Sequence, residues 1–319
     1  MAAAAVVQQK TAASNNAANP RNTVTRAEHF AAFLPPLLLA AERVAATVEQ
    51  GVHGRRRTGA GDAFWQFRRY SPGDSIGRID WRQTAKRMQA FVRENEWEAA
   101  ESVWLWRDPS PSMAWASEQA RERKDERADL LLLACASLLL RGGERVALLG
   151  APERPANGRS VLPRMAERLA IQRGLEASKR AEASLPPLVP LPRYGQTVLI
   201  GDFLYPLPEI AARLRGLADQ GVKGCVVRIV DPAEEDFPYR GRTRFLGLEG
   251  EGDMLAPRAE QLAAEWRPAF AAHQEGVAEI CRRLGWHHIK HRTDKPAESV
   301  LMALYLALEG GGSRDGRRR

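Results

Sequence analysis

Short apolar runs alternate with longer amphipathic segments from residue 102 onward. The short runs predict buried strands at 102–106, 145–149, 197–200, 225–230 and 287–290. Apolar residues at helical spacing predict helices at 125–141, 162–172, 207–220, 257–284 and 297–309. A long loop is expected at 231–253, with a short hairpin at 239–248. Strands separated by helices predict an α/β fold with a doubly wound, mostly parallel sheet.

The segments before residue 102 differ in character and suggest a division of the chain. Ala, Asn and Gln dominate the first residues, as in a disordered leader, and residues 53–97 combine many aromatic side chains with ten Lys and Arg. The predicted parts are a leader at 1–26, an N-terminal helix at 27–52, a basic and aromatic module at 53–97, the α/β domain at 98–310 and a flexible basic tail at 311–319.

Composition places the chain among soluble globular proteins, with 44% apolar and 27% charged residues in 319. The net charge of +8 is compatible with nucleic acid, an anionic membrane surface or acidic partners, although a solvated basic surface is the better explanation. Cys135, Cys225 and Cys281 are widely spaced, as in a protein of a reducing compartment. Without a signal peptide or an apolar run of bilayer length, we expect a cytoplasmic protein with at most peripheral membrane contact.

Candidate chemistry appears directly after the first predicted strand of the α/β domain. There Asp108, Ser110 and Ser112 stand two residues apart, with proline at both spacer positions. Hard divalent cations such as Mg²⁺ prefer oxygen ligands, keep several waters and need few carboxylates. The three side chains therefore predict part of a cation site, and a turn rich in Pro, Ser and Asp is the alternative.

A second carboxylate, Asp202, follows the predicted strand at 197–200. In open α/β sheets, ligands bind outside the carboxyl ends of the strands. If the strands before Asp108 and Asp202 are neighbours, about 4.8 Å apart, both carboxylates flank one crevice. Asp202 is also placed to cap the helix expected from Leu207, and the two roles are compatible.

Taken together, this pattern resembles the metal-ion-dependent adhesion site of von Willebrand factor A-like domains. Three upstream blocks extend the resemblance: Phe67–Asp74 reads Phe-Arg-Arg-Tyr-Ser-Pro-Gly-Asp, Arg78–Arg82 reads Arg-Ile-Asp-Trp-Arg, and Phe91–Glu94 reads Phe-Val-Arg-Glu. They are similar to the signature of the bacterial family called domain of unknown function 58. By the order of its segments, the resemblance covers roughly residues 40–310.

The resemblance implies a protein without catalytic activity that acts as an adaptor. Members of that family are associated with MoxR-type AAA ATPases and other von Willebrand factor A-like proteins, in the assembly or maturation of complexes. It implies Mg²⁺ or another divalent cation held by Asp108, Ser110, Ser112 and Asp202, with an open position for a partner's carboxylate. Adhesion-type sites usually add a threonine after the second strand, where this chain offers only Ser160.

Two features of the sequence suggest functions other than that of an adaptor. The basic and aromatic module could bind nucleic acid, although acidic residues between its rings favour internal ion pairs. Ser75 stands in a Gly-x-Ser-x-Gly sequence, which a hydrolase would place between a strand and a helix. The surrounding pattern predicts neither element there. No phosphate-binding loop is present, so a partner would have to supply any nucleotide energy.

Overall fold

The computed structural model describes residues 6–7, 37–49, 64–69, 91–95, 102–175, 184–249 and 252–312. Two compact units form the chain, one of residues 1–51 with 102–319 and one of residues 52–101. In the second unit, β2 (Phe64–Arg69) and β3 (Phe91–Asn95) form an antiparallel pair. Most of the predicted leader, the predicted module and the basic tail, including Tyr70, Ser75 and Trp81, lie outside the described residues.

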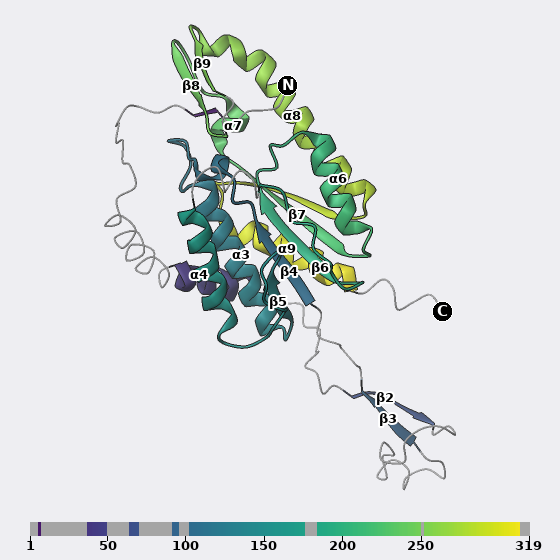
Figure 1. Cartoon of the computed structure of the whole chain (residues 1–319). Helices are drawn as coiled ribbons and strands as arrows, with labels where there is room; N and C mark the ends of the chain where they lie inside the picture. Colours follow the sequence, from purple (N-terminus) through teal and green to yellow (C-terminus); the bar gives the residue numbers. More distant parts are fainter. Residues whose placement is uncertain are drawn as a thin grey trace. The chain divides into compact units, whose positions relative to one another are not determined.

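Five parallel strands form the central sheet of the larger unit, in the order β10-β7-β6-β4-β5 (Figure 1). The order places β4 at an interior position, with β6 and β5 as its neighbours. The carboxyl ends of β4, β6 and β7 therefore lie side by side at one edge of the sheet. The strands are β4 (Ser102–Arg107), β5 (Arg145–Leu148), β6 (Gln196–Gly201), β7 (Lys223–Val230) and β10 (His287–Arg292).

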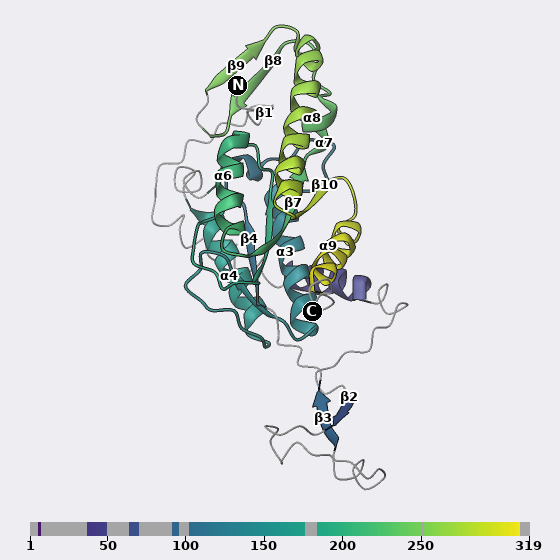
Figure 2. The same ribbon diagram turned by 90° about the vertical axis from the view of Figure 1, so that its right-hand side faces the viewer.

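Helices cover both faces of this sheet (Figures 1 and 2). On one face α3 (Lys124–Arg141) packs against α4 (Val161–Gly174) and α9 (Ala297–Gly312). On the other face α6 (Leu207–Ala218) packs against α8 (Ala259–Arg283). The chain thus has the predicted α/β fold with a doubly wound parallel sheet.

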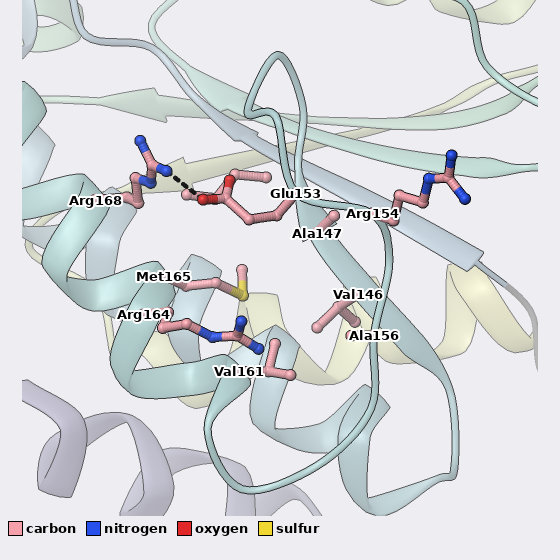
Figure 3. A pocket seen from close by; sticks show the side chains of 10 residues that line it. Val146, Ala147, Glu153, Arg154, Ala156, Val161, Arg164, Met165 and Arg168 are labelled. Atoms are coloured by element: carbon pink, nitrogen blue, oxygen red, sulfur yellow. Dashed lines mark hydrogen bonds and ion pairs between the residues drawn. The ribbon is translucent and has the colours of Figure 1, made fainter.

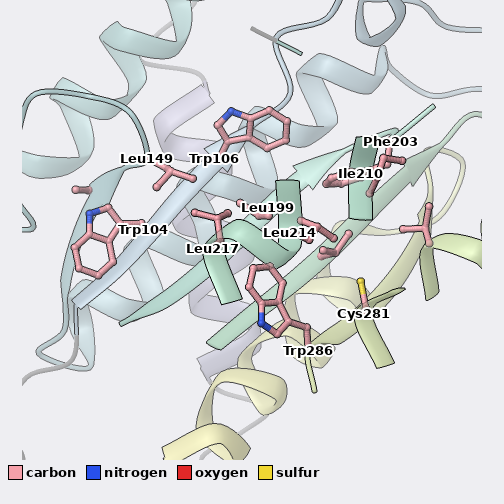
Figure 4. Packing of buried hydrophobic residues seen from close by; sticks show 13 residues of the cluster. Trp104, Trp106, Leu149, Leu199, Phe203, Ile210, Leu214, Leu217, Cys281 and Trp286 are labelled. Carbon is pink, nitrogen blue, oxygen red and sulfur yellow. The ribbon is translucent and has the colours of Figure 1, made fainter. Parts of the chain in front are cut away.

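The core on the α6 and α8 face is rich in aromatic side chains. Trp104, Trp106 and Trp286 are buried there with aliphatic residues of β6 and α6 (Figure 4). Gly224 of β7 makes room for one of these rings, because a Cβ at that position would lie 2.1 Å from the Trp286 indole. The packing anchors β4, β6 and β7 rigidly and so holds their carboxyl ends in place.

The segment between β7 and α8 differs from the expectation. Its first residues form α7 (Pro232–Asp236), and the hairpin pairs β8 (Thr243–Gly247) with β9 (Asp253–Ala256), so the predicted hairpin at 239–248 was wrong. Gly241 lies within the predicted hairpin, and glycine is a residue type that is common in hairpin turns. Its N–H instead donates to Glu260 and its carbonyl accepts from Ala259, which ties it to the start of α8. A third strand, β1 (Val6–Val7), pairs antiparallel with β8.

Candidate functional site

Three strand ends bring carboxylates together at the edge of the central sheet. Asp108 follows β4, Asp202 follows β6 and Asp231 follows β7. The pairing of β4 with β6, on which the predicted crevice depends, is present, and the Asp108 N–H donates to the carbonyl of Ile200 at 2.8 Å. The two predicted carboxylates therefore lie on neighbouring strands.

Asp108 is buried, with a side chain only half satisfied by hydrogen bonds. Its Oδ1 accepts from the Ser110 N–H at 2.8 Å, and its Oδ2 is buried without a hydrogen-bond partner. Burial, followed by the nearby Asp202 carboxylate, raises the pKa of Asp108 well above its ordinary 3.8. The carboxylate lies against Gly201, where an added Cβ would come within 3.0 Å of Oδ2.

The two predicted serines connect Asp108 to Asp202. Both flank the start of a 3₁₀ turn at Pro111–Ala114 and are buried. Their hydroxyl oxygens are 2.9 Å apart, and Ser112 Oγ donates to Asp202 Oδ2 at 2.7 Å. All four predicted residues thus belong to one buried cluster, in which the serine oxygens lie between the two carboxylates.

Asp202 is the better compensated carboxylate of the two. Lys124 Nζ, on the first residue of α3, donates to its Oδ2 at 2.8 Å. Burial opposes ionisation of Asp202, yet the Lys124 ammonium outweighs it and holds the pKa of Asp202 below 3.8. Asp202 Oδ1 accepts from the Leu204 N–H at 3.3 Å, and Pro206 is the residue before α6. Asp202 therefore stabilises a local turn, and its alternative role as the cap of α6 was wrong.

Lys124 and Glu234 belong to this cluster but were not foreseen. Lys124 Nζ also donates to Glu234 Oε1 at 2.5 Å, and both side chains are buried. Glu234 is held by a capping box, in which the Asp231 N–H donates to Glu234 Oε2 at 2.9 Å and Asp231 Oδ1 accepts from the Ala233 N–H at 2.8 Å. The sequence signal that could have identified this part of the site is Asp231, because it directly follows an apolar strand in the same way as Asp108 and Asp202.

A second buried cation, Arg228, lies near the end of β7. Its Nη2 is 3.2 Å from His273 Nδ1 on α8, and its other two nitrogens have no hydrogen-bond partner. Burial lowers the pKa of Arg228 to about 10, although Asp202 acts in the opposite direction. The sheet edge therefore carries buried charges of both signs.

The donor set fits a hard cation at Asp108 better than at Asp202. Asp108 Oδ2 is a buried acceptor without a partner, and the Ser110 hydroxyl interacts with the same carboxylate and with the Ser112 hydroxyl. Within the described residues, no group of three or more His, Cys, Asp or Glu side chains is arranged to hold a metal, so serine oxygens would have to contribute. Ser160, considered in place of a threonine, is exposed and its hydroxyl accepts from Arg164 instead.

Within the part of the chain that the structure describes, no helix is long and apolar enough to span a bilayer. Cys135, Cys225 and Cys281 are buried and free.

Comparison with known proteins gives relatives whose functions are not characterized. Uncharacterized protein Rv1480 of Mycobacterium tuberculosis and uncharacterized protein Mb1516 of Mycobacterium bovis are each 28% identical over 284 residues, 83% of this chain and 86% of theirs.

Among solved structures, the conserved hypothetical protein BatB of Bacteroides thetaiotaomicron is 12% identical, with a TM-score of 0.37 over 66% of this chain and 98% of that one. An aerotolerance-related membrane protein of Bacteroides fragilis is 14% identical, also with a TM-score of 0.37, over 66% and 100% of the two chains. Such scores identify neither a family nor a function.

The family model described as Protein of unknown function DUF58 matches residues 66–276, which include most of β2, all of β3 and the strand ends that carry Asp108, Asp202 and Asp231. This chain therefore belongs to that family.

Proposed function

We propose that this chain is a non-enzymatic interaction protein with a cation site of the adhesion type at Asp108, similar to that of von Willebrand factor A-like domains. One observation carries the proposal. Asp108 Oδ2 is buried without a hydrogen-bond partner, while the Ser110 hydroxyl interacts with the same carboxylate and lies 2.9 Å from the Ser112 hydroxyl. A buried carboxylate with an unpaired oxygen is costly unless it is protonated or neutralised by a cation. Mg²⁺ suits this small set of oxygens.

The residues divide into two roles. Asp108, Ser110 and Ser112 would hold the cation directly or through water. Asp202, already bonded to Lys124 and Ser112, orients the serine hydroxyl from behind. A bound cation supplies an open coordination position for a carboxylate of a partner protein.

We infer that the partner is a MoxR-type AAA ATPase, another von Willebrand factor A-like protein, or both, in the assembly or maturation of a protein complex in the cytoplasm. The family resemblance supports this partner class, and the chain's lack of a phosphate-binding loop is consistent with an ATPase partner. Binding of the purified ATPase to the immobilised full chain should be reduced at least tenfold by a chelator. Equal binding with and without chelator would exclude a cation-dependent interface.

The cation site is tested by thermal unfolding in excess Mg²⁺ and in chelator. A cation that binds only the folded state adds about 2.7 kcal/mol at one hundred times its Kd. Asp108→Asn keeps the shape of the side chain but removes its charge, so it should abolish the shift in Tm. Asp219→Asn, an exposed carboxylate at the end of α6, is the matched control and should retain it. An unchanged Tm of the unsubstituted chain at millimolar Mg²⁺, Mn²⁺ and Ca²⁺ would refute the proposal.

A further inference from the structure

A cavity of about 720 Å³ lies beside the candidate cation site. It reaches Pro109, the neighbour of Asp108, and Tyr205, three residues after Asp202. Its other walls are α4, α6 and the proline-rich segment at 184–189. The lining is mainly apolar, and Ile171 on α4 is 57% exposed. We refer to this cavity as the groove.

A second cavity of about 230 Å³ lies between β5 and α4 and shares part of its lining with the groove. Leu148 and Arg168 line both cavities. Figure 3 shows Met165, Val161 and Val146 around this second space, which we call the anchor cavity. It has room for one bulky aliphatic or aromatic side chain and is too small for most ligands of drug size.

An exposed ion pair lines the anchor cavity, and its arginine also lines the groove. Arg168 on α4 pairs with Glu153, and the two side chains are 46% and 41% exposed. Exposed pairs of this kind contribute little free energy, so Arg168 can exchange Glu153 for an incoming carboxylate at small cost. The pair, drawn in Figure 3, is thus a replaceable contact in the wall of the anchor cavity.

The charged side chains that line the two cavities are mostly basic. Four are arginines and two are glutamates, a difference of +2. A basic lining attracts an acidic occupant and selects against a basic one. The six residues are Arg154, Arg164, Arg168, Arg213, Glu153 and Glu209.

We propose that the groove and the anchor cavity bind an extended acidic segment of a partner protein, with one bulky apolar side chain in the anchor cavity. Two cavities that share Leu148 and Arg168 as lining residues suit an extended chain better than one compact small molecule. A single buried apolar anchor within a polar surround is also the usual source of affinity in such interfaces. The end of the groove at Pro109 would bring an acidic side chain of that segment to the cation proposed at Asp108. This contact at Asp108 rests on the proposed function.

The probe is a phage-displayed library of random peptides, selected on the immobilised full chain with Mg²⁺ and again with chelator. Selected peptides should combine acidic residues with a large apolar residue. Their synthetic forms should bind Ile171→Glu and Arg213→Glu at least tenfold more weakly, a loss of about 1.4 kcal/mol. Two variants serve as matched controls and should bind normally: Arg215→Glu, exposed on the same helix as Arg213, and Leu306→Glu, exposed on α9.

The outcomes distinguish this inference from the proposed function. Peptides selected without acidic or bulky apolar residues, or bound equally by Ile171→Glu, would overturn the assignment of the groove as a binding site for an acidic segment. This holds even where Mg²⁺ stabilises the chain. Peptides that are selected in chelator and no longer bind Ile171→Glu and Arg213→Glu would support peptide binding in the groove, and would show that this binding does not need the cation. A dimer of the full chain that forms with rising concentration and is abolished by Ile171→Glu would identify a second copy as the occupant and overturn the partner segment.

Discussion

Gly201 illustrates at the scale of single residues how closely the candidate site is packed. An ideal Cβ at this position would lie 2.6 Å from the Cβ of Asp108. Gly201→Ala must therefore displace the Asp108 side chain, at a cost of about 1–3 kcal/mol. We expect lower stability in urea unfolding and a loss of the Mg²⁺-dependent shift in Tm.

Gly142→Ala is the control for this substitution, because its Cβ would meet no atom closer than 3.3 Å. It should leave the Mg²⁺ response intact. A Gly201→Ala chain that responds to Mg²⁺ as the unsubstituted chain does would show that the position of Asp108 is unimportant for the cation.

Lys124 provides a second test at this scale, because its ammonium neutralises Asp202 and Glu234 in a buried environment. Lys124→Met leaves two buried carboxylates without their counter-ion, which costs about 3–5 kcal/mol. Equilibrium unfolding in urea should show this loss, and Mg²⁺ should restore more stability than it adds to the unsubstituted chain. Lys290→Met, which removes an exposed partner of Glu235, should cost at most about 1 kcal/mol. Equal losses in the two variants would contradict a buried, interdependent cluster.

The positions of Asp108 and Asp202 could be predicted from sequence, because each directly follows an apolar run that forms a strand. Lys124 could not, because it is 78 residues before Asp202 and 110 before Glu234, and its own segment indicates only the start of a helix. Contacts across such separations depend on how α3 packs on the sheet. The apolar pattern of a sequence predicts where strands end. The side chains from other elements that contact residues at these ends can be identified only in the folded structure.

At the scale of elements, strand and helix order was predictable and the connection before α8 was not. Each central strand lies within two residues of the range expected for it, because buried parallel strands are short apolar runs. The hairpin of β8 and β9 lies further along the chain than expected, and Gly241, inside the range expected for it, bonds to Ala259 and Glu260 at the start of α8. A bond between residues 19 apart in the chain cannot be recognised from a local apolar pattern.

The edge strand β10 carries a pH-sensitive contact at His291. Burial, with Arg127 adding to it, lowers the pKa of His291 from 6.5 to about 4. Since the folded-state pKa lies below the unfolded one, neutral His291 contributes stability above pH 6.5 that is lost as the pH falls toward 4. The shift corresponds to about 3 kcal/mol. Urea unfolding at pH 7 and pH 4 should show that His291→Leu is less sensitive to acid by this amount.

His287→Leu, an exposed position on the same strand, is the control for this effect. It should follow the acid response of the unsubstituted chain. An acid sensitivity that His291→Leu leaves unchanged would place the titrating group elsewhere.

At the scale of the whole molecule, every residue of the candidate site and of the groove belongs to the larger unit. The cluster from Asp108 to Glu234 and both cavities are formed by residues 106–234, whereas the other unit comprises residues 52–101. The candidate cation site and the basic, aromatic segment therefore belong to different units. Their separation also distinguishes the adaptor from the nucleic-acid-binding alternative, which depends on residues 53–97.

Replacement of residues 52–101 by a flexible Gly-Ser linker tests this separation. Because no described residue of the smaller unit belongs to the central sheet, the shortened chain should fold cooperatively and retain its Mg²⁺-dependent shift in Tm, within about 1 kcal/mol of the full chain. Any binding of oligonucleotides at low salt should disappear with the deleted segment, since its ten Lys and Arg would provide the phosphate contacts. A shortened chain that folds but no longer responds to Mg²⁺ would show that residues 52–101 complete the cation site. Retained oligonucleotide binding would place the basic surface on the larger unit.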